Sequence, residues 1–272
     1  RDRSVSRGLG DVYKRQLPTS VIHSLNFDQE VSRSAIGQPI GSFYAYKEDG
    51  LFQSEAEIKS YTNNKGELLQ PNAKPGDIKF VDVNGDGVID GNDRDYIGNP
   101  LPDVTAGLTL GVNFHNFDLS LFFQGMFGND VYDLTRYVGD FYNQSQYNKN
   151  SRVVNAWTPT NTNTDIPRVT MDDPNNNIRP SSYYVQDASF VRLKNMKIGY
   201  SVPQSILSKI KFNSLYIYAQ ATNLFTITGY DGIDPEVGLQ SYSSDYRNLD
   251  MGVDRGIYPL SRTFTFGVNV SF

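Results

Sequence analysis

The sequence predicts an all-β chain that forms part of an antiparallel transmembrane β-barrel with long loops, and three observations lead to this expectation. Aromatic residues make up 13% of the chain and there are 23 Gly, a balance that favours strands, where aromatic side chains pair across a sheet. Several segments alternate apolar and polar residues with a period of two. Short and long connections follow one another along the chain, as they do in outer-membrane barrels.

The overall composition narrows the function classes. The chain has 25 Lys+Arg against 30 Asp+Glu and a net charge of -5, which argues against nucleic acid or an anionic membrane surface as a partner. It has no Cys, so disulfides, Cys-ligated zinc, iron-sulfur clusters and thiol nucleophiles are ruled out. No stretch approaches the roughly 18 consecutive apolar residues of a spanning helix, which excludes an α-helical membrane protein but leaves a barrel open.

Residues 1–16 differ from the rest of the chain. They hold five basic and two acidic residues and show no strand alternation. They also lack an apolar stretch of the length that a signal peptide needs. This lead is therefore left unassigned, as extraneous sequence or as a disordered or native segment, and the fold is expected within residues 17–272.

The clearest predicted strands form a hairpin. Residues 104–114 alternate over 11 residues, about the length that a tilted strand needs to cross a bilayer. His115 and Asn116 follow as a tight turn, and residues 117–127 alternate again. One face of this hairpin collects the apolar residues Ala106, Leu108, Leu110, Val112, Phe114, Phe117, Leu119, Leu121, Phe123 and Phe127.

Later strands are expected at residues 189–202, 214–224 and 263–272. In the first of these, the apolar residues change parity near Lys194 and Asn195, which predicts a β-bulge or a strand only partly in lipid. The last alternates cleanly to its terminal aromatic residue, which fits either a soluble half-buried strand or the final strand of a barrel. With two weaker candidates, residues 21–27 and 41–52, the sequence predicts about six strands.

The connections between these strands alternate in length. Residues 115–116 and 203–213 are short, whereas residues 53–102, 128–187 and 225–262 are long. Outer-membrane barrels place short turns on the periplasmic side and long loops outside. If Phe272 lies at the periplasmic end, every long loop is extracellular.

Aromatic residues in the long polar loops have two interpretations. They could stack on sugars or pack the loops against their neighbours, and packing or interfacial anchoring is favoured because aromatic residues are expected near strand ends. The residues concerned are Tyr142, Tyr147, Trp157, Tyr183 and Tyr184.

An acidic loop at residues 82–93 has the spacing of a calcium-binding loop. Ca²⁺ prefers six to eight oxygen ligands, and the loop offers Asp82, Asn84, Asp86, the carbonyl of Val88, Asp90 and Asp93. The loop resembles the dockerin type, with Asp at its last position. A cluster of Asx turns without metal is the alternative, and a structural Ca²⁺ is favoured.

The sequence offers little that points to catalysis. Neither His23 nor His115 has a metal-ligand or nucleophile motif beside it, and no G-x-S-x-G, G-x-G-x-x-G, P-loop or H-E-x-x-H motif occurs. Carboxylate pairs for glycoside hydrolysis are spatial and stay open. The acidic residues cluster where calcium explains them, so the chain is not expected to be an enzyme.

An ordered series of segments closely resembles the C-terminal third of SusC/RagA-type TonB-dependent outer-membrane receptors. The resemblance covers residues 17–272. The order of the segments along the chain is more specific than any one of them. The segments are residues 39–46 (PIGSFYAY), 76–80 (GDIKF), 97–103 (IGNPLPD), 117–120 (FDLS), 123–125 (FQG), 190–195 (FVRLKN), 199–203 (GYSVP), 223–225 (NLF), 232–236 (GIDPE) and the final aromatic strand.

This resemblance implies a multi-pass protein of the bacterial outer membrane, with about 22 strands around a plug, of which this chain supplies about six or seven. The family implies nutrient import, of oligosaccharides or peptides. The implied partners are a SusD-like surface lipoprotein, TonB-ExbB-ExbD acting through an N-terminal part absent here, the barrel-assembly machinery and outer-membrane lipid. Phe264, Phe266 and Phe272 resemble the C-terminal signal for barrel assembly.

Two other functions compete with this interpretation. A soluble, calcium-stabilised β-sandwich that binds carbohydrate explains the acidic loop and the aromatic residues, but not the alternation of loop lengths. A β-sandwich glycosidase ranks third. The sequence does not identify the cargo or the residues that contact it.

Overall fold

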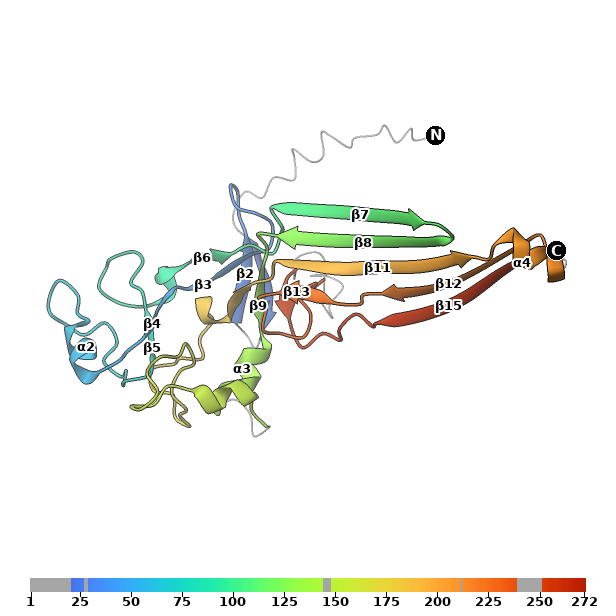
Figure 1. Ribbon diagram of the computed structural model, residues 1–272. Coiled ribbons are helices and arrows are strands. Elements are labelled where there is room, and N and C mark those ends of the chain that lie inside the picture. Colours follow the sequence, from blue (N-terminus) through green and yellow to red (C-terminus); the bar gives the residue numbers. More distant parts are fainter. Residues whose placement is uncertain (1–20, 27–28, 144–147, 211, 239–250) are drawn as a thin grey trace, which may run out of the picture. The chain divides into compact units, whose positions relative to one another are not determined.

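The computed structural model describes residues 21–26, 29–143, 148–210, 212–238 and 251–272 (Figure 1). The unassigned lead, residues 1–16, lies outside this part of the chain. Unit 1 comprises Arg1–Leu101, Val131–Gln186 and Val237–Arg255, and unit 2 comprises Pro102–Asp130, Asp187–Glu236 and Gly256–Phe272. None of the helices in the described residues has the length and apolar character needed to cross a membrane.

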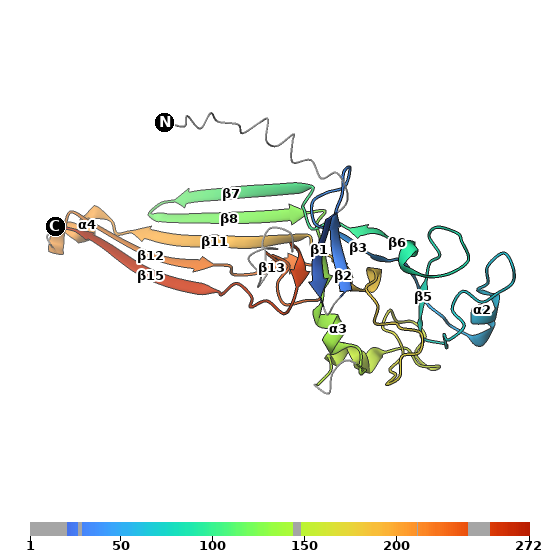
Figure 2. The same ribbon diagram turned by 180° about the vertical axis from the view of Figure 1, so that it is seen from behind.

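Unit 2 is built on one antiparallel sheet of long strands, seen from both sides in Figures 1 and 2. Its order is β15-β12-β11-β8-β7, and the short β13 also pairs with β11. The strands are β7 (Val104–Phe114), β8 (Phe117–Phe127), β11 (Phe190–Ser201), β12 (Ser214–Thr222), β13 (Thr226–Thr228) and β15 (Thr263–Ser271). The predicted long strands are confirmed to within two residues at each end.

The short connections of this sheet form as local chemistry dictates. His115 adopts a positive φ of 54° in the two-residue turn between β7 and β8, a conformation that His tolerates better than most residues. Asn116 Nδ2 donates to the carbonyl oxygen of Ser201 at 2.7 Å and so ties this turn to β11. The β11–β12 connection contains helix α4 (Gln204–Ile210) directly after Pro203, where a missing N–H costs a helix little.

Unit 1 consists of shorter elements. Its sheets have the orders β1-β2-β3-β6, β4-β5 and β10-β9-β14. The strands are β1 (Val21–Asn26), β2 (Gln29–Ser34), β3 (Ser42–Tyr46), β4 (Glu48–Leu51), β5 (Ile78–Phe80), β6 (Arg94–Gly98), β9 (Asp130–Asp133), β10 (Val185–Asp187) and β14 (Val253–Asp254). The helical elements are α2 (Glu55–Ser60), α3 (Thr135–Gly139) and three 3₁₀ turns, η1 (Gly91–Asp93), η2 (Ser151–Asn155) and η3 (Ser182–Tyr184).

The prediction of one strand at residues 41–52 was wrong. The chain breaks at Lys47, so that β3 pairs with β2 and β6, whereas β4 pairs with β5 in another sheet. Alternation alone does not report such a break, because the apolar residues on either side keep a strand-like spacing.

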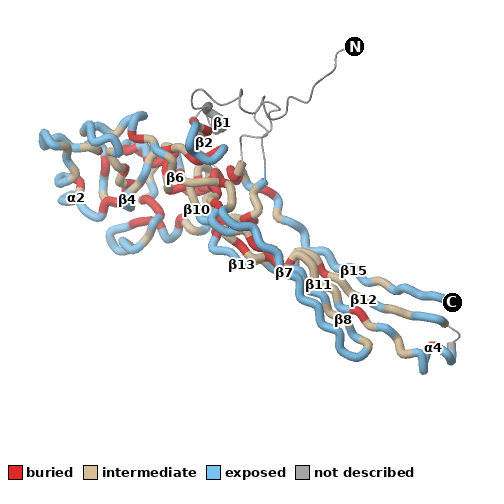
Figure 3. The backbone as a smooth tube through the Cα atoms, turned by 90° about the horizontal axis from the view of Figure 1, so that it is seen from above, coloured by how far each residue is buried: buried red, intermediate tan, exposed pale blue. Residues whose placement is uncertain are grey.

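The long connections of the sequence supply the core of unit 1. Buried side chains from residues 53–102, 128–187 and 225–262 pack with those of the earlier strands, and buried segments appear in red in Figure 3. The packing prediction is confirmed for Trp157, Tyr183 and Tyr184, which are buried, whereas Tyr142 is exposed; Tyr147 lies outside the described residues. The core comprises Val31, Phe43, Leu51, Ile78, Phe80, Tyr132, Leu134, Phe141, Trp157, Ile178, Tyr183, Tyr184 and Val253.

Candidate functional site

The long sheet of unit 2 has two chemically different faces. Leu110 of β7 lies opposite Leu121 of β8, which lies opposite Met196 of β11. Met196 lies opposite Ala221 of β12, and Ala221 opposite Phe264 of β15. Directly opposed residues share a face, so one apolar face crosses the whole sheet. It also includes Leu108, Val112, Phe114, Phe117, Leu119, Phe123, Ile198, Ile217, Ala219, Phe266 and Val268.

Much of this apolar face is exposed. Val112 retains 57% and Phe266 80% of its accessible surface, and β7 and β15 are pale blue along nearly their whole length in Figure 3. Soluble monomers rarely expose contiguous apolar patches above roughly a few hundred Å². The face therefore requires an apolar phase or a partner against it.

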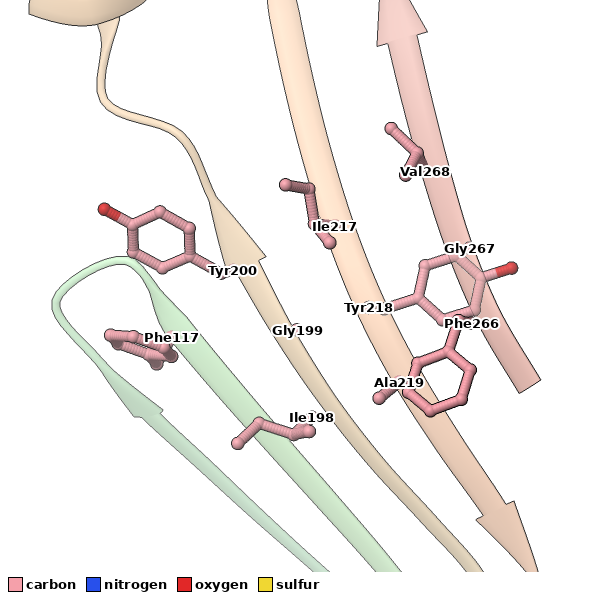
Figure 4. A pocket seen from close by; sticks show the side chains of 10 residues that line it. All are labelled: Phe117, Ile198, Gly199, Tyr200, Ile217, Tyr218, Ala219, Phe266, Gly267 and Val268. Atoms are coloured by element: carbon pink, nitrogen blue, oxygen red, sulfur yellow. The ribbon is translucent and has the colours of Figure 1, made fainter. Parts of the chain in front are cut away.

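A hollow of about 370 Å³ interrupts the apolar face (Figure 4). It arises because the small Ala219 stands in register between the larger Ile198 and Phe266. Four strands contribute the side chains on this face, which are Phe117, Ile198, Tyr200, Ile217, Ala219, Phe266 and Val268. The hollow is thus a local depression in the apolar face.

The opposite face carries hydrogen-bonding and charged groups. The Tyr216 hydroxyl donates to Asp118 Oδ2 at 2.9 Å. Lys197 Nζ lies 4.9 Å from the ring centroids of both Tyr216 and Tyr218, a distance at which a cation is attracted to the face of a ring. These contacts place a polar cluster on the face opposite the apolar side chains.

Two glycines make room for these tyrosines. A Cβ at Gly199 would collide with the Tyr216 hydroxyl and the Asp118 carboxylate, and a Cβ at Gly267 would collide with the Tyr218 ring. Glycine in the interior of a strand commonly indicates such a close approach. The two rings therefore lie against the sheet.

The predicted β-bulge in β11 is confirmed. Leu193 lies opposite Phe123 and Asn195 opposite Phe122, so that Lys194 is the additional residue. A bulge shifts the alternation of side chains by one position. The shift explains why the apolar residues change parity in the sequence at this point.

Charged side chains beside the bulge hold a distant segment of unit 2. Arg192 is 2% exposed and donates to Asp234 Oδ1 at 2.6 Å, to Glu236 Oε2 at 2.9 Å and to Thr226 Oγ1 at 2.7 Å. Lys194 Nζ donates to the same oxygen of Glu236 at 2.7 Å. Removing one partner from a buried ion pair typically costs about 3–5 kcal/mol, so this cluster is a strong local anchor.

Asp234 extends this anchor to a second chain segment. Its carboxylate also accepts the backbone N–H of Glu236 at 2.9 Å and of Leu260 at 3.1 Å. Burial raises the pKa of Asp234, but these N–H groups and Arg192 outweigh burial and hold the pKa below its ordinary value. Sequence reasoning missed this cluster, because residues 192 and 234 are paired only in space.

The predicted calcium ligands Asp82, Asn84, Asp86, Val88, Asp90 and Asp93 lie together in the loop between β5 and β6. The side-chain oxygens of the Asp and Asn residues accept backbone N–H groups of the loop itself. Asp82 accepts two, at 2.7 and 2.8 Å, and the buried Asp93 accepts three. No group of three acidic, His or Cys side chains suited to a metal occurs among the described residues. Calcium binding therefore stays a prediction.

The aromatic residues of the predicted assembly signal lie at the end of the chain. Phe264 and Phe266 belong to β15 and to the apolar face. Phe272 follows β15, is 82% exposed and meets the Phe212 ring edge to face at 5.1 Å. Their recognition by an assembly machinery stays a prediction.

Comparisons with known proteins agree with this fold. No protein-family model matches the chain. TonB-dependent receptor P3 of Formosa agariphila is 37% identical over 250 residues, which are 92% of this chain and 24% of that protein. Receptor P26 of the same organism is 34% identical over 241 residues (89% and 23%). SusC of Bacteroides thetaiotaomicron is 27% identical over 246 residues (89% and 20%).

Two solved structures share the architecture. The RagAB peptide importer in its open-open state aligns with a TM-score of 0.65 at 22% identity, covering 93% of this chain and 24% of that chain. The same importer in its closed-closed state aligns with a TM-score of 0.63 at 25% identity. This alignment covers 89% of this chain and 24% of that chain.

Long antiparallel strands with one exposed apolar face and one polar face define the wall of a membrane-spanning β-barrel. The curated relatives of this chain are TonB-dependent receptors rather than enzymes. The chain belongs to the TonB-dependent receptors of the SusC/RagA type. It spans about a quarter of the length of the curated relatives that it matches.

Proposed function

We propose that this chain forms part of the barrel wall of an outer-membrane, TonB-dependent transporter that imports nutrients. The observation that supports this most directly is the apolar face shared by β7, β8, β11, β12 and β15. In lipid these side chains contact hydrocarbon, while the polar face lines the interior of the barrel.

The strand length fits a bilayer. β7 and β8 each contain 11 residues. At about 3.4 Å per residue and a tilt of about 45°, such a strand spans about 26 Å. The apolar band of an outer-membrane barrel is about 25 Å tall, so each strand suffices for one crossing.

The soluble carbohydrate-binding β-sandwich explains the sheet less well. A sandwich covers the apolar face of one sheet with the apolar face of another. In unit 2, Val112, Phe114, Phe266 and Val268 remain exposed. A membrane supplies the missing apolar surroundings, and a second sheet is not needed.

The cargo and partners follow from the family. We propose oligosaccharide or peptide as cargo, a SusD-like lipoprotein as surface partner and TonB-ExbB-ExbD as the source of energy. The relatives named SusC and the RagAB peptide importer support this. Transport of this kind needs no covalent chemistry from the chain.

Single-cysteine substitution in the full-length receptor gives a direct test, because this chain has no Cys and any Cys elsewhere in the receptor can first be replaced by Ser. Cysteines at Leu108, Leu121 and Val268 should resist a water-soluble maleimide in outer-membrane vesicles, because the reactive thiolate does not form in hydrocarbon. Matched cysteines at the neighbours Thr109, Ser120 and Asn269 should meet water inside the barrel and react with that reagent. Equal labelling of both sets, or release of the receptor from membranes by salt, would overturn the proposal.

A structural Ca²⁺ in the loop of residues 82–93 is a separate proposal. Asn84, Asp86 and Asp90 are exposed and have the oxygen chemistry that Ca²⁺ prefers. Asp82 and Asp93 fit less well, because both oxygens of each carboxylate already accept backbone N–H groups. Titration of the receptor with Ca²⁺ should release or absorb heat, less in Asp86→Asn and unchanged in Asp95→Asn. No heat at millimolar Ca²⁺ would remove the proposal.

A further inference from the structure

A second hollow lies within unit 1, and one of its lining residues, Gly91, belongs to the predicted calcium loop. Its volume is about 390 Å³, within the range of about 300–1,000 Å³ that is usual for small-molecule sites. Four stretches of sequence meet around it. The lining residues are Glu30, Tyr46, Gly91, Arg94, Asn176, Arg179 and Pro180.

Arg179 is a half-buried cation in this hollow. No carboxylate of the described residues forms an ion pair with it. Its guanidinium lies 5.1 Å from the ring centroid of Tyr46 and 4.4 Å from that of Phe80. Nε donates to the carbonyl oxygen of Asn176 at 3.0 Å and Nη2 to that of Asn175 at 2.8 Å. Among the described residues, none forms an ion pair with Arg179, and its Nη1 group has no acceptor.

The acidic side chain that acts electrostatically on Arg179 is already engaged. Asp173 accepts the backbone N–H of Asn177 at 2.8 Å and of Ile178 at 3.1 Å. Burial lowers the pKa of Arg179 from its ordinary value, and Tyr46 and Asp173 offset this only in part. The guanidinium has thus lost part of its hydration, and no described residue supplies an ion pair in return.

The carboxylate that lines the hollow, Glu30, is already engaged by two other guanidinium groups. Glu30 is buried and accepts Arg33 Nε at 2.6 Å and Nη2 at 2.8 Å. Arg94 Nη1 donates to the same carboxylate at 3.2 Å. One carboxylate therefore serves two guanidinium groups, and Arg179 has no counter-ion of its own among the described residues.

We propose that this hollow binds the carboxylate group of a small solute, with Arg179 as the principal donor. The planar guanidinium presents parallel N–H groups that match the two oxygens of a carboxylate, and such pairs are stronger than neutral hydrogen bonds. Two aromatic rings hold the guanidinium in place, which reduces the conformational entropy lost on binding.

The inference rests on the proposed function in one respect, because it makes the solute an acidic cargo. A uronic acid of an oligosaccharide and the C-terminus of a peptide share this chemistry. Binding can be measured without transport. Failure to bind therefore overturns the inference alone, while the membrane labelling described above tests the barrel wall.

The test uses the full-length receptor in detergent and isothermal titration with glucuronate, with alanyl-alanine and with glucose. Glucuronate or alanyl-alanine should bind, and the one that binds identifies the source of the carboxylate. Glucose should not bind. Arg179→Gln should weaken binding at least tenfold, and Lys65→Gln, which removes an exposed charge elsewhere in unit 1, should leave it unchanged.

A second pair of variants preserves the contacts of Arg179. Gly91 accepts a side chain, because a Cβ added there would meet no other atom within 4 Å and its φ is not positive. Gly91→Glu should weaken binding by placing a competing carboxylate at the hollow, whereas Gly91→Gln should bind nearly as the parent does. No binding of either acid, equal affinity in Arg179→Gln, or equal effects of the two Gly91 variants would overturn the proposal.

Discussion

The two units use apolar side chains in opposite ways. In unit 1, Phe43, Ile78 and Phe80 are fully buried in a core made from irregular loops and short strands. In unit 2, Val112 and Phe266 belong to long regular strands and point away from any core. The contrast shows that the surrounding phase decides where apolar residues go, since water drives them inward and hydrocarbon does not.

The strongest test of this contrast removes the hydrocarbon. We expect the chain produced alone in water to be insoluble or aggregated, because unit 2 exposes its apolar face and the edge strands β7 and β15. Size-exclusion chromatography without detergent measures the outcome. A monomer that melts cooperatively would contradict the assignment of the apolar face to lipid.

A core substitution sharpens the contrast within the full-length receptor. Phe80→Ala in unit 1 should lower the free energy of unfolding by about 3–5 kcal/mol, because it leaves a cavity. Phe266→Ala in unit 2 should cost clearly less, since lipid or detergent fills the space. Chemical unfolding followed by proteolysis of each unit measures both. Equal losses would mean that Phe266 packs against protein.

A charge on either face of the sheet gives a smaller but more specific effect. Leu110→Arg should lower the free energy of unfolding in lipid vesicles by about 2–4 kcal/mol, because it places a cation in hydrocarbon. Thr109→Arg, one residue earlier and on the polar face, should have little effect. If Thr109→Arg destabilised the receptor more than Leu110→Arg, the face that carries Thr109 would be the one in contact with lipid.

The smallest expected effect is a pH dependence confined to unit 1. Burial raises the pKa of Glu48 from its ordinary 4.5 to about 7, with Asp165 adding to the shift and Arg136 opposing it. The native state therefore holds a proton that the unfolded state releases between these values, so stability is highest below them and falls as pH rises through about 7.

Glu48→Gln should remove this loss, which we expect to be on the order of 1 kcal/mol after allowance for solvent screening. In the full-length receptor, with any Trp outside this chain replaced by Phe, the fluorescence of the buried Trp157, the single Trp of this chain, reports the unfolding of unit 1 at about pH 5 and pH 8. Glu55→Gln, at an exposed site, is the control. If the free energy of unfolding of Glu48→Gln still fell between these pH values, another group would cause the pH dependence.

Local patterns predicted unit 2 well. Period-two alternation identified the long strands, and the change of parity near Lys194 predicted the bulge. Such patterns suffice here because the apolar side chains of neighbouring long strands lie in register on one face of the sheet. The hairpin turn at His115 and Asn116 followed from the same alternation.

The organisation of unit 1 was not predictable from these patterns. The Trp157 indole N–H donates to Gln53 Oε1 at 3.0 Å across 104 positions of sequence, and Asn177 Oδ1 accepts the Ile78 N–H at 2.8 Å across 99. No local period reports such pairs. The same limit hid Arg179, whose importance depends on rings and carbonyl groups that come together only in the fold.

Gly199 and Gly267 determine how closely two tyrosine side chains approach the backbone on the polar face. Because neither has a side chain, Tyr216 and Tyr218 rest against the backbone instead of standing up from it. A Cβ at either position would collide with a tyrosine and force its ring to move away from the backbone. The height of the aromatic side chains above this side of the sheet therefore depends on the absence of two methyl groups.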